Sequence, residues 1–259
     1  MEVPAMFDLS SKVALVSGAS RGIGAATAEI LAEFGAHVIL TSRKAENLKE
    51  VQVRIKNAGN KATAMVCHNG DLSQIESLFE KIRERHGRLD ILVNNAATNP
   101  YYGSVLGVDE KAWNKTMDVN LKGPFFMSQH AARLMRENLD LHGGGSIVNV
   151  SSINGRIPMH NQSIYSMSKA ALISMTQAFA KELGRDKIRV NALLPGLTDT
   201  KFASAMTQNE DFMKDVLQQI PLGRIAQPSE MSGMVLFLVS DAASYITGST
   251  FTVDGGMQA

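Results

Sequence analysis

The sequence predicts a single α/β domain, in which a doubly wound, mostly parallel sheet of about seven strands carries helices on both faces. Three observations lead to this prediction. Short apolar runs of strand length alternate with longer helical patterns along the chain of 259 residues. Several helical patterns stop at a glycine, which readily adopts the left-handed conformation of a helix cap. No shift in composition and no internal repeat marks a second unit, so we expect residues 1–259 to form one domain.

The chain opens with a strand, a turn and a helix. The apolar run Lys12–Ser17 predicts the first strand, and a glycine-rich turn joins it to the helical pattern Gly22–Phe34, which stops at Gly35. The same alternation then continues through two strand–helix pairs and a further strand. These elements are expected at His37–Thr41, Ala45–Ala58, Lys61–Cys67, Ser73–His86 and Leu89–Asn94.

The second half of the chain is less even. A long helical pattern runs from about Asp109 to Leu139 and is interrupted at Gly123-Pro124, because proline does not continue a helix. The segment Thr198–Pro228 predicts an irregular excursion between a strand and a helix. Strands joined by helices form right-handed crossovers, which makes the sheet parallel. The remaining strands and helices are expected at Ser146–Ser151, Gln162–Gly184, Arg189–Leu194, Ser229–Ser240 and Thr250–Val253.

The bulk composition excludes several classes of protein. Lys and Arg (26) nearly balance Asp and Glu (25), so we expect neither a nucleic-acid partner nor an anionic membrane. The single cysteine, Cys67, excludes an intrachain disulfide and suits a reducing compartment. The first eleven residues do not resemble a signal peptide, and no stretch approaches the roughly 20 apolar residues that span a bilayer. The scattered histidines lack zinc-ligand spacing. We therefore expect a cytoplasmic protein without a metal site.

In a doubly wound sheet the ligand binds beyond the carboxyl ends of the strands, where the strand order reverses. The search for function therefore concentrates on the residues that follow each strand. These are Gly18–Gly24, Ser42–Arg43, Cys67–Asp71, Asn94–Ala97, Ser151–Ser152 and Pro195–Thr200.

The turn after the first strand, Ser17–Gly24 (SGASRGIG), opens directly into a helix. Glycines allow the backbone to approach a pyrophosphate closely, and the helix N-terminus presents unpaired N–H groups to it. Glycines also punctuate ordinary turns, and the spacing is GxxxGxG rather than GxGxxG, but the strand–turn–helix context favours a phosphate site. The expected contacts are Gly18, Ser20, Arg21, Gly22, Ile23 and Gly24.

The end of the second strand indicates which nicotinamide dinucleotide binds. An acidic residue there usually bonds the ribose 2′-hydroxyl, whereas this chain has Ser42 and Arg43. Arg43 can pair with a 2′-phosphate, and Arg21 can approach it from the other side. The alternative is that Arg43 is a solvated charge at a helix start. The pattern favours NADP(H), with NAD(H) as the alternative.

A pair of serines ends the strand that precedes Tyr165 and Lys169. A spacing of four places Tyr165 and Lys169 on one helix face. A free tyrosine has a pKa of about 10, and a nearby ammonium lowers it, so Tyr165 can exchange a proton with a substrate oxygen while a hydride moves. Ser152 would hold that oxygen by a hydrogen bond. These residues predict the interconversion of a ketone or aldehyde and an alcohol.

Together these motifs resemble the classical short-chain dehydrogenases/reductases, which have a Rossmann-type fold, over a stretch from about Lys12 to Gly256. In that family the GxxxGxG turn is usual. The motifs that carry the resemblance are Ser17–Gly24, Asn94–Ala97 (NNAA), Asn120, Ser152, Tyr165 with Lys169, Pro195-Gly196 with Thr200, and the ending TGSTFTVDGG.

The resemblance also implies roles for residues. Ser152 stands thirteen residues before Tyr165, as the catalytic serine of the family does, and is preferred to Ser151. Asn120 would help to hold a water chain that carries protons to Lys169, although it could equally be a helix-breaking residue. Lys169 would also bond the nicotinamide ribose. The further cofactor contacts that the resemblance implies are Asn94, Ala96, Tyr165, Thr198 and Thr200.

The chain departs from the family pattern at three places. Ser17 replaces the commoner threonine and keeps its hydroxyl. Ala97 replaces a glycine beside the cofactor. At the end of the third strand the family has an acid that contacts adenine, whereas this chain has His68 and Asn69. We expect Asn69 to face the cofactor, with Asp71 either contacting the adenine or lying at the next helix start.

The segment Asn94–Gly103 resembles the carbonyl-reductase and retinol-dehydrogenase-like subgroup, which acts on bulky apolar carbonyls. The alternatives are a 3-oxoacyl thioester reductase, an NAD-dependent secondary alcohol dehydrogenase and, outside the enzymes, a cofactor-sensing scaffold protein. Enoyl reductases space their Tyr and Lys more widely. The candidate apolar walls of the substrate pocket are Tyr101, Tyr102, Ile153, Met159 and Phe202.

Members of the family commonly form dimers or tetramers through their two longest helices and last strand. Here these segments would be Asp109–Leu139, Gln162–Gly184 and Thr250–Val253, and the resemblance therefore implies a homo-oligomer that acts on a small molecule.

Overall fold

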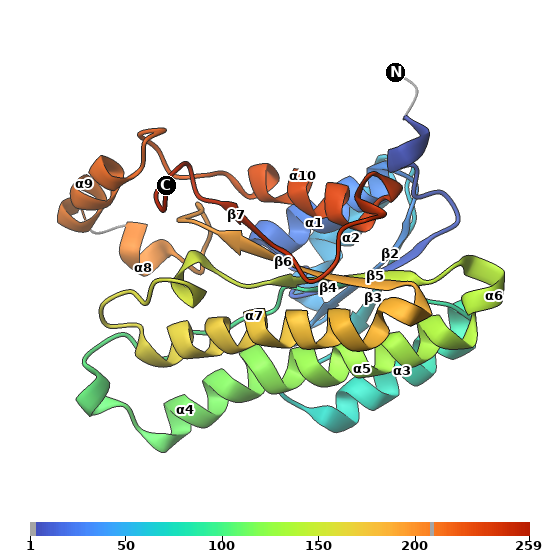
Figure 1. The fold of residues 1–259 in the computed structure, drawn as a ribbon, viewed down its shortest axis with the longest axis horizontal. Coiled ribbons are helices and arrows are strands. Elements are labelled where there is room, and N and C mark those ends of the chain that lie inside the picture. The colour runs from blue at the N-terminus through green and yellow to red at the C-terminus, as the bar shows by residue number, and fades with distance from the viewer. Residues whose placement is uncertain (1–3, 208–209) are drawn as a thin grey trace.

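The computed structural model describes residues 4–207 and 210–259. Residues 1–3, and residues 208–209 inside the expected excursion, lie outside the described residues. One sheet of seven parallel strands runs in the order β3-β2-β1-β4-β5-β6-β7, which confirms the predicted doubly wound sheet (Figure 1). The strands are β1 (Val13–Ser17), β2 (His37–Ser42), β3 (Ala62–Val66), β4 (Ile91–Asn94), β5 (Gly145–Val150), β6 (Ile188–Pro195) and β7 (Thr250–Val253).

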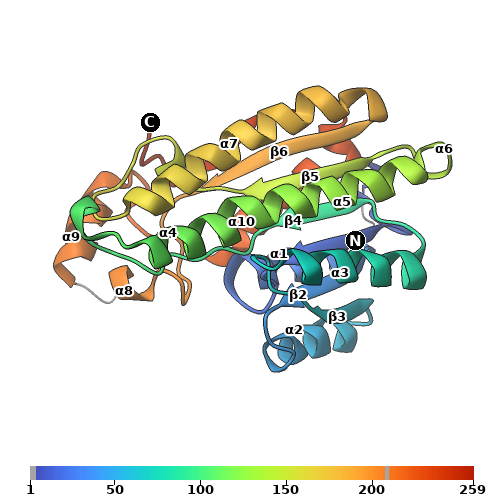
Figure 2. The ribbon, with the colours of Figure 1, turned by 90° about the horizontal axis from the view of Figure 1, so that it is seen from below.

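Helices cover both faces of this sheet (Figures 1 and 2). On one face lie α1 (Gly22–Glu33), α2 (Glu46–Asn57) and α10 (Pro228–Val239). The other face carries α3 (Leu72–His86), α5 (Gly123–Glu137) and α7 (Ser163–Leu183). The remaining helices are α4 (Glu110–Met117), α6 (Leu139–His142), α8 (Ser204–Thr207) and α9 (Glu210–Gln219).

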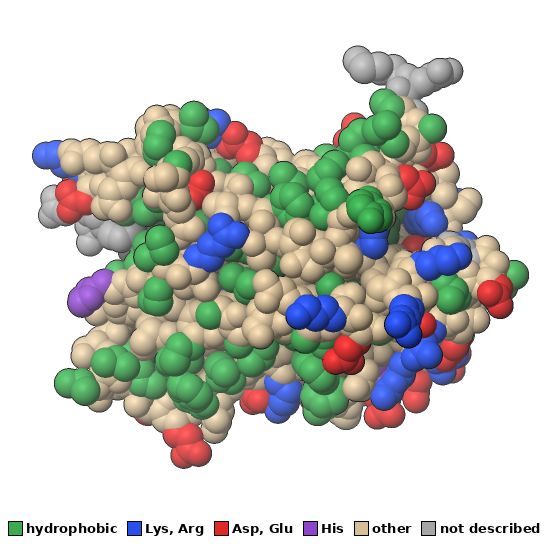
Figure 3. All heavy atoms as spheres, in the orientation of Figure 1, with side chains coloured by type: hydrophobic (Ala, Val, Ile, Leu, Met, Phe, Trp, Pro, Cys, Tyr) green, Lys and Arg blue, Asp and Glu red, His purple; other side chains and the backbone are tan. Residues whose placement is uncertain are grey.

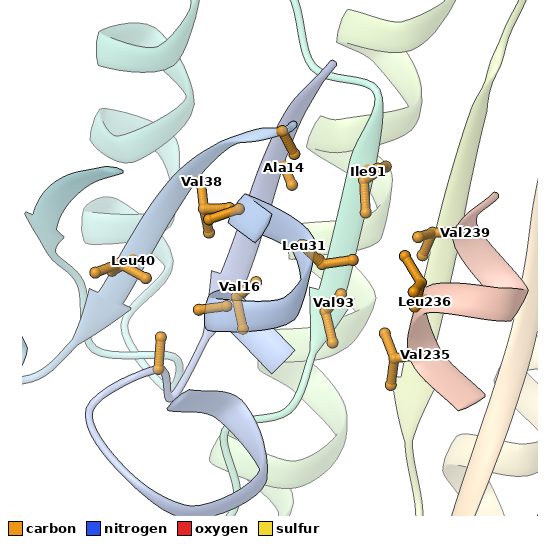
Figure 4. Packing of buried hydrophobic residues seen from close by; sticks show 14 of the residues in the cluster. Ala14, Val16, Leu31, Val38, Leu40, Ile91, Val93, Val235, Leu236 and Val239 are labelled. Atoms are coloured by element: carbon orange, nitrogen blue, oxygen red, sulfur yellow. The ribbon is translucent and has the colours of Figure 1, made fainter. Parts of the chain in front are cut away.

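Two hydrophobic clusters hold these layers together, because alternate residues of a strand point to opposite faces. Val16 of β1, Leu31 of α1 and Val235 of α10 belong to one cluster, and Figure 4 shows Val93 of β4 lying between Val16 and Val235. The residue before Val16, Leu15, belongs to the opposite cluster with Met127 of α5. All five residues of β1 are buried, as expected for a central parallel strand that is covered on both faces.

The long helical pattern breaks a few residues earlier than expected. Residues Asp118–Lys122 form a π-helical turn, and α5 begins directly after it at Gly123. Pro124 lies in the first turn of α5, where a proline is tolerated because the first N–H groups of a helix have no partner within it. The π-turn thus makes the break that the sequence had assigned to Gly123-Pro124.

The strand order reverses between β1 and β4. These two strands are parallel neighbours, so their carboxyl ends lie side by side. The expected excursion after β6 lies at this end and contains α8 and α9, which Figures 1 and 2 show beside the C-terminus. A parallel bridge between Thr198 and Ala226 closes the base of the excursion. Among the described residues, no helix has both the length and the apolarity needed to cross a membrane.

Candidate active site

A cavity of about 280 Å³ opens at the carboxyl ends of the strands, at the point where the strand order reverses. Gly24, Asn94 and Asn120 were predicted site residues but do not line it. The predicted residues that do line it are Gly18, Ser20, Arg21, Gly22, Ile23, Ser42, Arg43, Asn69, Ala96, Ser152, Tyr165, Lys169, Thr198 and Thr200.

The turn after β1 needs its glycines for conformation and for space. Gly18 has a φ of +66°, and a Cβ there would lie 2.8 Å from the Cα of Ala96. Gly22 has a φ of +56° and begins α1. Gly24 lies on the inner side of the turn, where a Cβ would overlap the carbonyl of Gly18. Gly24 therefore serves the packing of the turn and does not line the cavity.

The first turn of α1 has no side-chain cap, since the Arg21 side chain makes no capping hydrogen bond. The leading N–H groups of this helix, which carry partial positive charge, therefore remain available to an anion. Arg21, Gly22 and Ile23 all line the cavity at this point. This local structure suits a pyrophosphate, as the sequence predicted.

The described lining of the cavity is cationic. It includes five lysine and arginine side chains and no aspartate or glutamate. Arg43, at the end of β2, makes no hydrogen bond or ion pair with another described residue, whereas the Ser42 hydroxyl donates to the carbonyl of Lys44 at 2.8 Å. The cavity therefore suits a ligand with several negative charges. The five cations are Arg21, Arg43, Lys115, Lys169 and Lys201.

Ser152, Tyr165 and Lys169 converge on one wall of the cavity. The hydroxyls of Ser152 and Tyr165 are hydrogen-bonded to each other, and Ser152 Oγ accepts the N–H of Asn154 at 3.1 Å. Lys169 Nζ lies 5.6 Å from the centroid of the Tyr165 ring and donates to the carbonyl of Val150 at 2.8 Å. Ser151 instead donates to the carbonyl of Lys169 at 2.8 Å, which leaves Ser152 as the serine beside the phenol.

The ionisation of the pair differs from the prediction. Burial raises the pKa of Tyr165 to about 12, and the hydrogen bond from Ser152 lowers it only in part. Burial also lowers the pKa of Lys169 to about 7. The expectation that Lys169 lowers the pKa of Tyr165 is wrong for this structure, because burial opposes both charged forms. Tyr165 is therefore a neutral phenol near neutral pH and is set to donate a proton.

Asn120 lies behind the cavity wall, in the π-helical turn, and is completely buried. Its amide bonds both backbone groups of Thr98, with Oδ1 accepting the N–H at 2.8 Å and Nδ2 donating to the carbonyl at 2.9 Å. Nδ2 also donates to the hydroxyl of Ser168 at 3.1 Å. Asn120 therefore ties the segment after β4 to α7.

Asn94 was expected along the cofactor, but its side chain points into the core. Nδ2 donates to Ser128 Oγ and to Asn149 Oδ1, both at 2.9 Å. The next residue, Asn95, lines the cavity instead and donates to the carbonyl of Ser17 at 2.9 Å. The alternation of strand residues explains this direction, because Asn94 points to the same face as the buried Leu92. The alternation itself could have identified Asn95.

The expected apolar walls are only partly those observed. Ile153, Met159 and Phe202 line the cavity, and the ring of Phe202 lies 5.8 Å from that of Tyr165. Tyr101 and Tyr102 do not line it. The Tyr101 hydroxyl donates to the carbonyl of Ser104, and Tyr102 is exposed. Lining residues that sequence reasoning missed are Lys115, Val119, Asn154, Gln162, Val216 and Met257.

The side chains at the end of β3 line two pockets, since Asp71 lines a second, more open one together with Arg43 and His68. Which of these residues contacts the adenine stays a prediction. Asp71 caps α3, where its carboxylate accepts the Ser73 hydroxyl and the N–H groups of Gln74 and Ser73. The hydrogen bond from the Ser73 hydroxyl, followed by that from the Gln74 N–H, lowers the pKa of Asp71. His68 and Asn69 line the cavity, and Asp71 does not. Among the described residues, no group of three or more His, Cys, Asp or Glu side chains could hold a metal ion.

Comparison with known proteins agrees with this architecture. A family model described as enoyl-(acyl carrier protein) reductase matches residues 18–258. The human dehydrogenase/reductase SDR family member 4 is 40% identical over 248 residues, which cover 96% of this chain and 88% of the relative.

Solved structures superpose on nearly the whole chain. One such structure, from Sinorhizobium meliloti, is described as a provisional short-chain alcohol dehydrogenase. It has a TM-score of 0.92 and 40% sequence identity, and the match covers 97% of this chain and 98% of the other. A gluconate 5-dehydrogenase from Burkholderia cenocepacia, in complex with NADP and tartrate, has a TM-score of 0.92 and 30% sequence identity. The match covers 98% of this chain and 97% of the dehydrogenase. The chain therefore belongs to the short-chain dehydrogenase/reductase (SDR) family, whose members are oxidoreductases acting on an alcohol or carbonyl group.

Proposed function

We propose that this protein is an NADP(H)-dependent reductase that converts a bulky, apolar ketone or aldehyde into an alcohol, with Tyr165 as the proton donor. The observation that carries the proposal is the cavity itself. Its wall brings together Ser152, Tyr165 and Lys169, and its described lining holds five cations and no carboxylate.

The preference for NADP(H) rests on charge. The guanidinium of Arg43 has no described partner at the end of β2, where the adenosine ribose is expected. A 2′-phosphate there would pair with Arg43, and Arg21 lines the same cavity. A structural relative, the gluconate 5-dehydrogenase, binds NADP. The predicted cofactor residues that line the cavity would hold the dinucleotide, with Ala96, Thr198 and Thr200 beside its nicotinamide half.

The nicotinamide, when bound, supplies the hydride to the carbonyl carbon. The protein residues act on the carbonyl oxygen. Ser152 Oγ accepts the N–H of Asn154, and its hydroxyl bonds the phenol of Tyr165 in the structure. With a substrate bound, the Ser152 hydrogen would turn to the substrate oxygen and stabilise the charge that develops there. Tyr165 gives its phenolic proton to the same oxygen as negative charge develops there. Lys169, whose pKa of about 7 lets it both hold and release a proton, stands beside the phenol.

The apolar character of the substrate is inferred from the far wall of the cavity. The lining of the cavity includes the hydrophobic residues Ile153, Met159, Phe202, Val216 and Met257. An apolar pocket with a few placed polar groups is the usual design for recognising a bulky, uncharged ligand.

A sugar-acid substrate is the second candidate, because two buried amides lie among the apolar walls. Asn154 and Gln162 both line the cavity, and Asn99 donates to Gln162 at 3.1 Å. Amide groups suit hydroxyl-bearing substrates, and the similar gluconate 5-dehydrogenase acts on such a compound.

The test is the oxidation of NADPH and NADH, followed side by side by absorbance, against a panel of carbonyl compounds. The panel contains an aromatic diketone, a retinoid aldehyde, an acetoacetyl thioester and a sugar ketone. We expect turnover of the bulky carbonyls with NADPH. Turnover confined to the thioester or to the sugar ketone would replace the substrate assignment, and a preference for NADH would refute the cofactor assignment.

Arg43→Ala provides the matching variant for this test. Loss of a charge-assisted hydrogen bond to the 2′-phosphate should raise KM for NADPH by roughly 10- to 100-fold and leave KM for NADH nearly unchanged. Lys44→Ala is the control, because Lys44 is the adjacent cation and does not line the cavity.

Assembly and location remain predictions. We propose a homo-oligomer, and the hydrophobic side chains exposed on α4, α5 and α7 support it. A cytoplasmic location rests on the sequence alone.

A further inference from the structure

The chain turns back to the cavity after β7. Residues Asp254–Gln258 form a bend followed by turns, and Figure 1 shows this part of the chain beside α8 and α9. The Asp254 carboxylate holds the turns, because it accepts the N–H of Gly256 at 3.0 Å and the N–H of Gln258 at 2.9 Å. Met257 lies between these two held residues and lines the cavity.

On one side the turns pack against the excursion that follows β6. Leu222, which comes after α9, donates its N–H to the carbonyl of Gly255 at 3.2 Å. A Cβ at Gly255 would lie 2.8 Å from Cγ2 of Ile220, so the two segments are in close contact. The same excursion carries Val216, which is buried and lines the cavity. The turns are therefore supported by a segment that forms part of the apolar lining.

On the other side the turns are tied to the segment that carries Ser152. Gln258 Nε2 donates to the carbonyl of Ile153 at 3.1 Å, and Ile153 lines the cavity directly after Ser152. The same carbonyl also accepts the N–H groups of Arg156 at 2.9 Å and Ile157 at 3.1 Å, so it keeps hydrogen-bond partners without Gln258. Loss of the Gln258 bond should therefore preserve the fold and loosen the connection between the two segments.

The strand order places Met257 away from the expected adenosine half of the dinucleotide. Arg43 follows β2, near one edge of the sheet, whereas the turns follow β7, which is the opposite edge strand. The two segments that the turns contact carry Ile153 and Val216, which belong to the apolar lining. Met257 therefore lies at the end of the cavity where the carbonyl substrate is expected.

We propose that Met257 is a specificity-determining residue that limits the bulk of the carbonyl substrate, and that Gln258 is the positioning residue that holds it in place. This inference rests on the proposed function, since it requires that the cavity accepts a carbonyl compound. Methionine is unbranched and fills irregular apolar space. A shorter side chain at this position would leave room for a larger substrate, and a larger side chain would take that room away.

The experiment measures kcat/KM with NADPH for two diketones, 1-phenyl-1,2-propanedione and benzil, which carries a phenyl group in place of the methyl group. We expect the ratio of benzil to 1-phenyl-1,2-propanedione to rise by roughly tenfold in Met257→Ala and to fall by roughly tenfold in Met257→Trp. The intrinsic reactivities of the two diketones cancel when this ratio is compared between proteins. Met6→Ala is the matched control and should leave the ratio unchanged, since Met6 is exposed and does not line the cavity.

A purely structural role of Met257 would give a different result. Damage to the fold lowers kcat/KM for both diketones in both variants, and it does not move their ratio in opposite directions. The dissociation constant of NADPH, measured by the fluorescence of the reduced nicotinamide, should stay the same in all three proteins.

Gln258→Glu tests the positioning role, because a carboxylate of the same length cannot donate to the carbonyl of Ile153. We expect KM for benzil to rise by roughly threefold to tenfold, and kcat to change by less than about twofold. Gln258→Lys restores a donor and should return KM to that of the unchanged protein. A KM in Gln258→Lys as high as in Gln258→Glu would overturn the positioning role.

The outcomes separate this inference from the proposed function. If the unchanged protein reduces neither diketone and no other carbonyl compound of the panel, the proposed function fails and the inference fails with it. If both diketones are reduced and the ratio is the same in Met257→Ala, Met257→Trp and the unchanged protein, the inference alone is refuted.

Discussion

The phenol of Tyr165 is buried and uncharged near neutral pH, and this condition favours one direction of the reaction. Carbonyl reduction uses the phenol as it stands, since burial raises its pKa to about 12. Alcohol oxidation needs the phenolate. As long as the pH is below the pKa, the fraction of phenolate rises about tenfold for each unit by which the pH rises. We therefore expect oxidation to accelerate steeply as the pH rises, while reduction does not need the phenolate at any pH.

Tyr165→Phe removes the proton donor and keeps the ring. We expect kcat for carbonyl reduction to fall by about 10²- to 10⁴-fold, because a positioned proton donor contributes that much. The affinity for NADPH should change little, as measured by fluorescence titration. Tyr101→Phe is the control, since its hydroxyl bonds the carbonyl of Ser104 outside the cavity. Full activity in Tyr165→Phe would refute the assignment of Tyr165 as the proton donor.

Lys169 links the site to stability. Its pKa is about 7 in the folded protein and 10.5 ordinarily, so between these values the unfolded chain binds more protons than the native one. The stability of the ligand-free protein should therefore rise with pH across this window. Lys169→Met should reduce the rise, because methionine fills similar space without a charge. Urea unfolding at about pH 7 and about pH 9 measures the difference. Equal slopes in both proteins would contradict the assignment.

Some properties of single residues could be predicted from the sequence, and others could not. The spacing of Tyr165 and Lys169 implied a shared helix face, and both side chains do line one cavity. The depth of their burial is a tertiary property that spacing does not contain, so the expected lowering of the tyrosine pKa was wrong. The direction of the Asn94 side chain is a different case, because strand alternation, and not the motif, places it toward the core.

At the scale of elements, the π-helical turn Asp118–Lys122 shapes the cavity wall through Asn120. Asn120→Ala would leave the part-buried N–H and carbonyl of Thr98 without their partner. We expect a loss of about 1–3 kcal/mol in the free energy of unfolding, measured by urea denaturation. Asn114→Ala, on the exposed face of α4, is the control and should stay within about 0.5 kcal/mol of the unchanged protein. Equal stability of the two variants would show that the Asn120 bonds contribute nothing.

The sequence predicted the strands and most helices to within one or two residues. The strands show as short apolar runs, and several helices show a periodic apolar pattern that ends at a glycine or begins at an acidic cap. Gly87, in the left-handed conformation after α3, is one such signal. The π-turn had no comparable signal. It depends on hydrogen bonds from Asn120 to Thr98 and Ser168, which are distant in the chain.

At the scale of the whole molecule, α4, α5 and α7 together form a surface with exposed hydrophobic side chains. Trp113 of α4, Phe125 of α5 and Met167 of α7 are 41%, 39% and 44% exposed, and Phe125 contacts Phe179 of α7 ring to ring at 5.2 Å. Figure 3 shows hydrophobic side chains gathered over the region of α4. Surfaces of this kind commonly mark contacts between protein chains.

We therefore expect light scattering to report a dimer or tetramer. Phe125→Glu should shift the mass toward the monomer, because a charge would be buried in the contact. Leu141→Glu is the control, since Leu141 is 77% exposed on α6, outside the surface formed by α4, α5 and α7. A monomer for the unchanged protein, or an unaltered mass in Phe125→Glu, would remove the support that these helices give to the homo-oligomer.

The cationic lining of the cavity also has a consequence for the speed of encounter. Four exposed lysine and arginine side chains, Arg21, Arg43, Lys115 and Lys201, line the cavity without a described carboxylate. They create a positive potential that draws a polyphosphate toward the strand ends from a distance of several ångströms. Salt shortens the reach of that potential to about 10 Å at 0.1 M ionic strength and about 3 Å at 1 M. The association rate constant of NADPH, measured by stopped-flow fluorescence, should therefore fall as salt is added, while the dissociation rate constant changes much less. At low ionic strength the protein would therefore bind NADPH with a larger association rate constant than an uncharged site of the same shape.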